Sequence, residues 1–281
     1  MKMLVLGSGS AFYIGKRVGE NFQSNFMLIQ NGHRLLIDAG SDIRFSMRKA
    51  GLKPADITDI YLSHTHGDHD QGLEYLGFAT YFARLPKPRL YASQKVLDVL
   101  WENGLSGAMR SIQQKRTTLE TYFDVRPIGP NKAFEWAGVQ FQPVQAIHVM
   151  DGFELMPCYG LVFETDKLRI YFTCDTQFAP NQIMDFYRQA DIVFHDAETA
   201  KFMSGVHAHY SQLLTLPDEI RARLWLYHFN EGPLPNARED GFRGFLKRGQ
   251  VLDFARPETL HFPVQAPKGL TVETQGEQPG T

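Results

Sequence analysis

Residues 63–70, with the sequence SHTHGDHD, form a dense run of side chains that bind metals. Imidazole and carboxylate groups are the ligands that zinc-class divalent ions take near neutral pH. Side chains at positions i and i+2 of an extended segment share a face, so His64 and His66 are expected to hold one ion together. Gly67 permits a turn after them, which brings Asp68 and His69 within reach of a second ion. The spacing predicts a metal centre rather than isolated core histidines.

Further ligands are expected far along the chain, where apolar runs typical of strands come to an end. Such positions hold His148, Asp175, His195 and His228. Strand ends at one edge of a layered sheet converge, so residues distant in sequence meet there. The expected ligands of the first ion are His64, His66 and His148, those of the second are Asp68, His69 and His228, and the expected bridge is Asp175. A bridging carboxylate holds two ions about 3.5–4 Å apart, the separation used in two-metal hydrolysis.

Runs of β and helical character must place these residues. Strands are predicted at residues 3–6, 24–30, 34–37, 57–62, 89–92, 123–128, 132–136, 139–147, 159–164, 168–173, 192–194 and 224–227. Helices are predicted at residues 43–50, 71–82, 93–101, 181–189, 218–222 and 240–247, with one more beginning at Ser211. Asn31-Gly32 is a strong hairpin signal between two of the strands. The glycine-rich turn at residues 7–10 is expected to be a tight turn beside the metal site, with a phosphate cradle as the alternative.

The composition predicts a folded protein with a sizeable core. The chain has 281 residues, of which 43% are hydrophobic and 12% aromatic. Residues 1–262 contain no evident linker and are expected to form one domain, whereas residues 263–281 are polar, rich in Pro and Gly, and expected to be disordered. Two cysteines, Cys158 and Cys174, are too few for a disulfide framework.

Charge and hydropathy restrict the partners. A net charge of −2 argues against a protein that wraps along a nucleic-acid backbone, and it leaves room for a small anionic substrate held by metal. No apolar stretch approaches the length of a membrane helix, and the N-terminal apolar run is too short for a secretory signal. We therefore expect a cytoplasmic protein without a membrane partner.

The run at residues 64–69 resembles the HxHxDH signature of the metallo-β-lactamase fold superfamily. The later ligands match in order and context, since His148 follows a strand, Asp175 lies within TCDT, and His228 follows LWLY. The resemblance covers residues 1 to about 230. It implies an α/β fold, the four-layer αββα sandwich, with two mixed β-sheets inside and helices outside.

Two later motifs resemble the ribonuclease Z branch of that superfamily, which includes phosphodiesterases that act on cyclic nucleotides and cyclic ribose phosphates. FHDAE at residues 194–198 is similar to the branch's acidic motif, and VHAHY at residues 206–210 is similar to the segment of its later histidine. By position, Asp196 is implied to orient the general acid, and His207 is implied to be that acid. His209 is the alternative acid, because the family motif does not normally carry HxH here. Asp68 is expected to bind metal and also to orient the nucleophile.

The sequence departs from the tRNA 3′ processing enzymes of that branch. Those enzymes carry a long Gly/Pro-rich arm between the equivalents of His148 and Asp175, where this chain has room for two strands and little else. The resemblance therefore favours a small phosphodiester, above all a 3′,5′-cyclic nucleotide, hydrolysed by a hydroxide that bridges the two ions. The alternatives are a ribonuclease Z-like RNA endonuclease, a glyoxalase II-like thioester hydrolase or β-lactamase, and a metal-stabilised nucleotide-binding or redox protein.

Several features stay open at this stage. The cofactors are expected to be two divalent ions, zinc or in its place manganese, and a homodimer is implied because dimers are common in the branch. Residues 104–121 form either a solvated helix or a mobile cap whose Arg110, Lys115 and Arg116 meet an anionic substrate or a partner subunit. Asp38, placed just after a strand, is either an acceptor that fixes a ligand histidine or a helix cap.

Overall fold

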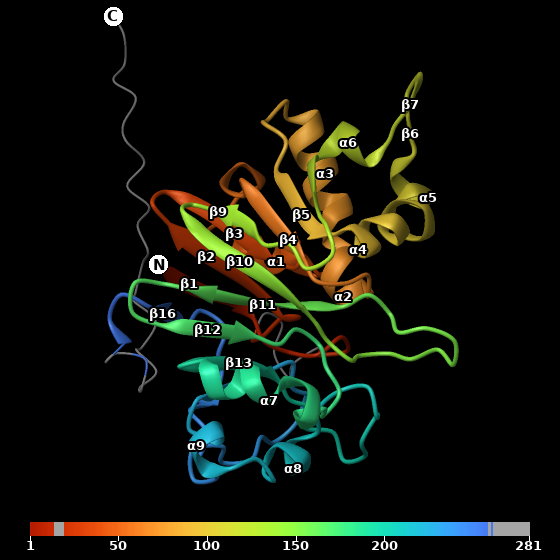
Figure 1. The fold of residues 1–281 in the computed structure, drawn as a ribbon. Helices are drawn as coiled ribbons and strands as arrows, with labels where there is room; N and C mark the ends of the chain where they lie inside the picture. The colour runs from red at the N-terminus through yellow and green to blue at the C-terminus, as the bar shows by residue number, and fades with distance from the viewer. Residues whose placement is uncertain (14–19, 258–259, 261–281) are drawn as a thin grey trace, which may run out of the picture.

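The computed structural model describes residues 1–13, 20–257 and 260. Two large mixed sheets lie face to face, and helices cover the outer face of each (Figure 1). The expected four-layer αββα sandwich is therefore confirmed. The tail expected at residues 263–281 lies outside the described residues, and the single domain over residues 1–262 stays a prediction.

The first sheet carries the strand that leads into residues 63–70. Its order is β16-β1-β2-β3-β4-β5-β8, in which β3, β4, β5 and β8 are parallel and the remaining pairs antiparallel. Asn31 and Gly32 turn β2 into β3 with φ of 50° and 79°, as the hairpin signal predicts. The bounds are β1 (Lys2–Gly7), β2 (Asn25–Gln30), β3 (His33–Ile37), β4 (Asp59–Leu62), β5 (Arg89–Ser93), β8 (Asp124–Ile128) and β16 (Val251–Asp253).

The second sheet carries the strands that lead into the later ligands. Its order is β15-β14-β13-β12-β11-β10-β9, with β12 to β15 parallel and β9 to β12 antiparallel. Parallel neighbours end at the same edge, which brings the residues after β12, β13 and β14 together. The bounds are β9 (Phe134–Trp136), β10 (Val139–Gln145), β11 (Tyr159–Glu164), β12 (Arg169–Phe172), β13 (Ile192–Asp196), β14 (Leu224–Tyr227) and β15 (Gly244–Phe245).

The helices that cover the first sheet are α1 and α3 to α6, and those that cover the second sheet are α7 to α9, as their buried residues show. A 3₁₀ turn, η1 (Pro54–Asp56), precedes β4, and a π-helix, η2 (Leu100–Leu105), continues α4. The bounds are α1 (Ile43–Lys49), α2 (Gly67–Asp70), α3 (Gly72–Phe82), α4 (Gln94–Val99), α5 (Ser106–Met109), α6 (Leu119–Tyr122), α7 (Pro180–Gln189), α8 (Tyr210–Leu213) and α9 (Asp218–Arg221).

The apolar core is divided into three layers by the two sheets. Successive side chains of a strand point to opposite faces, so Phe26 of β2 faces the second sheet while Met27 faces the helices. The Phe26 ring lies 4.8 Å from that of Phe172 and 5.2 Å from that of Tyr227, which joins the two sheets at the base of the site. Burial of each such aromatic side chain contributes about 1.5–3 kcal/mol of transfer free energy, which stabilises the packing of one sheet against the other.

The prediction of a helix at residues 240–247 is wrong. Part of this segment forms β15, which pairs in parallel with β14, and the Leu246 N–H donates to the Leu226 carbonyl over 2.8 Å. Gly244 has a φ of 127°, which lies outside the helical region. Pairing with the sheet edge and a glycine conformation override the helical periodicity of the sequence.

Residues 104–121 are neither a single helix nor an unattached loop. They form the end of η2, α5, a hairpin of β6 (Ser111–Ile112) and β7 (Lys115–Arg116) that projects from the body, and the start of α6 (Figure 1). Arg110 is paired with Glu102 at 2.6 Å, and the Lys115 ammonium lies 5.7 Å above the Tyr81 ring. Two of the three expected cations thus contact their own chain, and the role of the segment as a cap stays a prediction.

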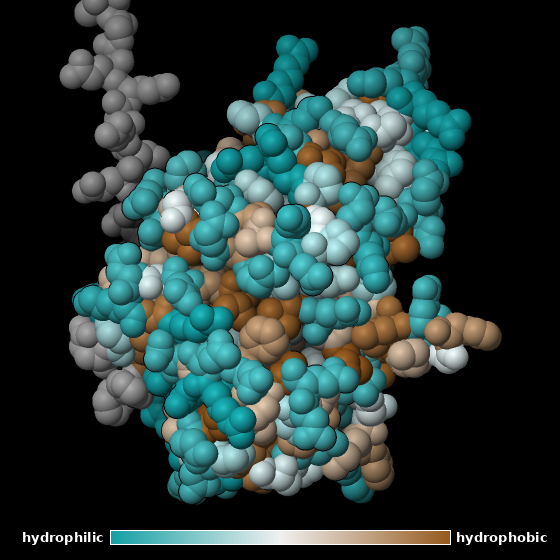
Figure 2. Space-filling model, in the orientation of Figure 1, coloured by the Kyte–Doolittle hydropathy of each residue, from teal (hydrophilic) through white to brown (hydrophobic). Residues whose placement is uncertain are grey.

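Hydrophilic residues cover most of the face seen in Figure 2, with apolar patches between them and on a loop that projects from the body. The loop after β10 extends at the right of Figures 1 and 2, and Met150 and Phe153 are 57% and 97% exposed there. Within the described part of the chain, no helix has both the length and the apolar character needed to cross a bilayer.

Candidate active site

The seven expected metal ligands meet at one edge of the sandwich. Each follows a strand: His64 and His66 follow β4, Asp68 and His69 lie in α2 just beyond them, and His148, Asp175 and His228 follow β10, β12 and β14. All are buried except His66, which is partly exposed. The fold therefore assembles the side chains chosen from the sequence, and their role as ligands is supported below by their geometry.

Three imidazole nitrogens converge in the group expected to hold the first ion. His66 Nδ1 lies 3.2 Å from His64 Nε2 and 3.0 Å from His148 Nε2. A tetrahedral zinc bound at 2.0–2.1 Å holds two nitrogen ligands about 3.3 Å apart. Both distances from His66 Nδ1 thus match the spacing that one such ion imposes.

A second group has the same spacing. Asp68 Oδ2 lies 3.2 Å from His69 Nε2 and 3.1 Å from His228 Nε2, and Asp175 Oδ2 lies 3.2 Å and 3.3 Å from the same two nitrogens. Asp175 Oδ2 is also 3.9 Å from both His64 Nε2 and His148 Nε2, so it faces both groups. His69 Nε2 and Asp175 Oδ1 are buried without a hydrogen bond among the described residues, which fits a site built for cations.

Asp38 fixes a ligand histidine rather than capping a helix. Its Oδ2 accepts hydrogen bonds from His69 Nδ1 over 2.8 Å and from the Ser63 hydroxyl over 2.7 Å, and its Oδ1 accepts the Ser63 N–H over 2.8 Å. Such outer partners select the tautomer that leaves Nε2 free for metal. Outer partners also lie beside His64 (Ser63 Oγ, 3.0 Å), His148 (Val206 carbonyl, 2.8 Å) and His228 (Asp196 Oδ1, 3.5 Å).

The backbone bends sharply where three strands deliver these groups. Asp38, Cys174 and His228 follow β3, β12 and β14 with φ of 60°, 58° and 61°, the left-handed region that costs a non-glycine residue roughly 1–3 kcal/mol. Beside them, a Cβ atom at Gly40 would overlap the Asp68 carbonyl oxygen. The close approach of the loop after β3 to α2 therefore requires glycine, and it clamps Asp68 and His69 in place.

Burial favours the metal-binding form of the first three histidines. It is the main cause that lowers the pKa of His64, His66 and His148 below the ordinary imidazole value. Metal ligation needs a neutral imidazole, so these residues do not have to lose a proton when an ion binds near neutral pH.

His207 and Asp196 form a hydrogen-bonded pair beside the expected metal ligands. His207 Nδ1 donates to Asp196 Oδ2 over 2.7 Å, while the Thr176 N–H donates to the same oxygen over 3.0 Å. Burial alone would lower the pKa of His207, but the Asp196 charge and hydrogen bond outweigh it and raise the pKa. Among the described residues His207 Nε2 has no hydrogen-bond partner, so the ring can give up a proton from Nε2 while Asp196 holds Nδ1.

The structure does not support His209 as the alternative acid. Its Nε2 donates to the Ala200 carbonyl over 2.9 Å, its Nδ1 lies 2.8 Å from the Ser211 hydroxyl, and its side chain caps α8. His207 and His209 lie only two residues apart, but their side chains have different partners because the chain turns into α8 at His209.

His195 also lies outside the site, although its strand ends at the same edge. Its Nε2 is 2.5 Å from the Tyr187 hydroxyl, and the ring is fully buried on the face of β13 opposite to Asp196. The rule that strand ends converge cannot distinguish two adjacent strand residues, whereas the alternation of side chains does. Asp196 points to the ligands and His195 to α7.

A cavity of about 470 Å³ opens above the metal ligands. Besides His66, Asp68, His148, Asp175, His207 and His228, its walls include Ala11, Phe12, Gln23, Ser41 and Gln71. Sequence reasoning missed the residues of this second set, since none lies in a recognisable motif. It also missed Ser63, whose place directly before His64 was the only signal, and Thr176.

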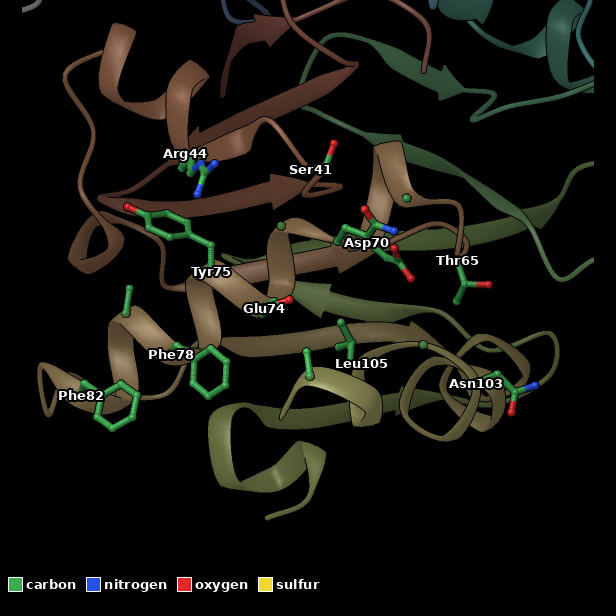
Figure 3. Close-up of a pocket in the computed structure, with 16 residues that line it drawn as sticks. Ser41, Arg44, Thr65, Asp70, Glu74, Tyr75, Phe78, Phe82, Asn103 and Leu105 are labelled. Carbon is green, nitrogen blue, oxygen red and sulfur yellow. The ribbon is translucent and has the colours of Figure 1, made fainter. Parts of the chain in front are cut away.

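A larger hollow of about 950 Å³ adjoins the cavity and shares Ser41, Gly67 and Gln71 with it. Figure 3 shows Arg44 of α1 and the rings of Tyr75 and Phe78 of α3 around this hollow. None of the predicted metal ligands is among its lining residues. The smaller cavity is therefore the one lined by the expected metal ligands.

The glycine-rich turn at residues 7–10 is a tight turn and not a phosphate cradle. The Gly9 N–H donates to the Phe22 carbonyl over 2.9 Å, and the Ser10 N–H donates to the Phe229 carbonyl over 3.0 Å. The Ser8 N–H donates to Asn21 Oδ1 over 3.2 Å. Because these donors are already used, they are not available to a phosphate.

The sequence matches the family described as Anti-Pycsar protein Apyc1 over residues 1–252. The Anti-Pycsar protein Apyc1 of Paenibacillus harenae is 31% identical over 236 residues, which cover 82% of this chain and 90% of that protein. That of Bacillus phage BSP38 is 30% identical over 237 residues, covering 81% and 88%. The family match includes every residue assigned to the candidate site.

Solved structures share the fold at lower identity. The metallo-β-lactamase fold protein YhfI of Bacillus subtilis has a TM-score of 0.68 at 18% identity, covering 89% of this chain and 98% of its own. A diphosphatase of the PhnP family has a TM-score of 0.68 at 22% identity, covering 90% and 97%. Human tRNase Z, short form, has a TM-score of 0.63 at 18% identity, covering 90% and 99%. These likenesses confirm the metallo-β-lactamase fold, the fold of metal-dependent hydrolases.

Proposed function

Since the chain belongs to the Anti-Pycsar protein Apyc1 family, we propose that it is a two-metal phosphodiesterase that hydrolyses a 3′,5′-cyclic nucleotide. The observation that carries this proposal is the Asp196–His207 pair beside two groups of metal ligands in one cavity. Thioester and β-lactam hydrolysis have no evident use for such a pair. A ribose oxygen, by contrast, is a poor leaving group that needs a proton as it departs.

Each residue of the cavity has a task in this proposal. Two divalent ions held by the seven ligands supply Lewis-acid stabilisation of a phosphoryl group and activation of water. Asp68 binds through Oδ2, and its other oxygen orients the attacking water. His207 donates the proton of Nε2 to the leaving ribose oxygen, while Asp196 keeps the imidazole in the required tautomer and stabilises its charge.

Zinc is the metal that we propose, with manganese as its substitute. The ligand set contains five imidazoles, which suit zinc, and two carboxylates, which suit both ions. Ser63 and Asp38 are buried, and their hydrogen bonds to His64 and His69 fix the tautomers of these two imidazoles before any ion binds. These contacts therefore favour a metal that prefers imidazole ligands.

A small substrate fits the cavity better than RNA. A volume of about 470 Å³ is within the range of small-molecule sites. Between His148 and Asp175 the chain has only β11, β12 and the loops that join them, so it has no arm to hold tRNA. The relatives are named Anti-Pycsar proteins, and an action against Pycsar is part of our proposal for this chain as well.

The decisive experiment is a substrate panel for the zinc- and manganese-loaded protein. The panel contains 3′,5′-cyclic CMP, UMP, AMP and GMP, linear dinucleotides, precursor tRNA, S-lactoylglutathione and nitrocefin. We expect the cyclic nucleotides to be opened to nucleoside monophosphates fastest, with an Asp175→Asn preparation as the control for contaminating enzymes. Turnover of the thioester or of nitrocefin without any phosphodiester cleavage would overturn the proposal, and cleavage of tRNA alone would replace it with an RNA endonuclease.

We also propose that the chain acts as a homodimer in the cytoplasm. The exposed side chains of Met150 and Phe153 on the projecting loop, and of Phe202 and Met203 on the loop before His207, support contact with a second copy near the site. Light scattering after gel filtration should give twice the chain mass of 32.0 kDa, and Phe153→Ser should shift the mass toward one chain. A wild-type mass of one chain at micromolar concentration would contradict the dimer.

A further inference from the structure

Phe12 lines the cavity at the candidate metal site, and its ring is largely exposed among the described residues. It is 91% exposed and lines the same cavity as His66, His148 and His207. It has no ring contact with another aromatic side chain of the described residues, and it belongs to none of the described apolar clusters. Single exposed apolar side chains are common on protein surfaces, but this one lines the cavity and is therefore accessible to a molecule that enters it.

The backbone beneath Phe12 is nevertheless held firmly. Gly9 pairs with Gln23 on one side and with Phe229 on the other, and the Gln23 side-chain amide donates to the Ala11 carbonyl over 3.1 Å. On the far side of Phe12, the Tyr13 N–H closes a turn onto Ser10. The Tyr13 ring packs edge-on against Phe229, with centroids 5.9 Å apart. The ring of Phe12 is thus presented by a fixed turn and not by a loose loop.

The same turn is joined directly to the metal ligands. The His228 N–H donates to the Ser8 carbonyl over 2.8 Å, and the Ser10 N–H donates to the carbonyl of the next residue, Phe229. Phe12 therefore keeps a constant position relative to the second metal group. A group that stacks on its ring is held at a defined place beside a phosphate bound at the metals.

We propose that Phe12 is the stacking platform of a nucleobase subsite, which receives the base of a nucleotide whose phosphate lies at the metal pair. This inference rests on the proposed function and names the part of the substrate that the ring recognises. Every nucleobase presents a π-face, so a platform of this kind binds purines and pyrimidines alike. The neighbouring Gln23 is not expected to distinguish one base from another, because its amide group is already hydrogen-bonded to Ala11, Ser41 and Asp42.

The test compares substrates with and without a base. Phe12→Ala should lower kcat/KM for all four cyclic nucleotides by about 5- to 150-fold, mainly through KM, as expected for the loss of one base–aromatic stack. The same variant should leave unchanged the hydrolysis of methyl riboside 3′,5′-cyclic phosphate, which has no base. Phe12→Trp should restore the nucleotide activity. Phe45→Ala is the matched control, because Phe45 is half exposed on α1 and lies outside the cavity.

A binding measurement gives a second readout that does not depend on turnover. Calorimetry should show that Phe12→Ala weakens the binding of CMP and AMP by the same factor, while the binding of ribose 5-phosphate is unchanged. Equal losses for ligands with and without a base would show a structural role, and no loss for either would exclude the platform. If the wild-type protein hydrolyses no cyclic nucleotide yet loses CMP affinity on Phe12→Ala, the proposed function fails and the base subsite stands.

Discussion

Replacing His207 with alanine is expected to slow the hydrolysis of a 3′,5′-cyclic nucleotide by about 10²–10⁴-fold, the range of general acid catalysis. The physical reason is the leaving group. A ribose oxygen departs as a strong base, and His207 lines the cavity with a ring nitrogen, Nε2, that has no hydrogen-bond partner among the described residues, while Asp196 holds Nδ1. A p-nitrophenyl phosphodiester releases a weakly basic phenolate, so the same variant should slow it less than tenfold. Steady-state kinetics on the two substrates measures the difference.

His209→Ala is the matched control for His207→Ala. Both residues are histidines in the same short segment, yet His209 bonds Ala200 and Ser211 and lies outside the cavity. We expect its kinetics on both substrates to stay near those of the wild-type protein once folding is verified by circular dichroism. Equal losses of His207→Ala on the ribose ester and on the nitrophenyl ester would assign His207 to substrate binding or metal support and not to proton transfer.

Much of this site could be predicted because its signals are local or follow from topology. The density of ligands in residues 63–70 requires no structure, and the ends of apolar runs then select His148, Asp175 and His228. The strength of this reasoning is that parallel strands share an edge. Its weakness is that it cannot choose between two adjacent residues at the end of one strand. His195 and Asp196 end the same strand, and only the alternation of side chains between the two faces of the sheet separates them.

The other misses arise where tertiary contacts decide the outcome. The helix expected at residues 240–247 is replaced by β15, because the edge of β14 offers hydrogen bonds that no local pattern reveals. Phe12 has no motif, and it gains importance only when a turn carries it to ligands more than fifty residues away in sequence. For Asp38 the sequence leaves two roles open, an acceptor for a ligand histidine or a helix cap, and only the fold, which places Ser63 and His69 next to it, decides for the acceptor.

Replacing Asp175 with asparagine is expected to abolish the two-ion site and to reduce hydrolysis by on the order of 10³-fold or more, several kcal/mol of transition-state stabilisation. Asp175 Oδ2 is the carboxylate oxygen that lies within 3.3 Å of the second group and 3.9 Å of the first, so its charge serves both ions. Asparagine keeps the size of the side chain but not this charge. Inductively coupled plasma mass spectrometry should find two ions per wild-type chain and at most one per variant chain.

Metal removal provides an independent measurement of the same cluster, because an ion that binds only the folded chain stabilises it by about 4 kcal/mol at a thousand times its Kd. EDTA should therefore lower the wild-type Tm markedly and the Tm of Asp175→Asn much less. Asp38→Ala is the control that distinguishes the loss of a metal ligand from the loss of a residue that only orients a ligand. It removes the hydrogen-bond acceptor of His69 and Ser63 but none of the expected ligands, so it should weaken metal affinity by about 10–100-fold and recover its activity in excess zinc. Asp175→Asn should not recover at any zinc concentration, and an active variant with two bound ions would show that Asp175 does not bridge them.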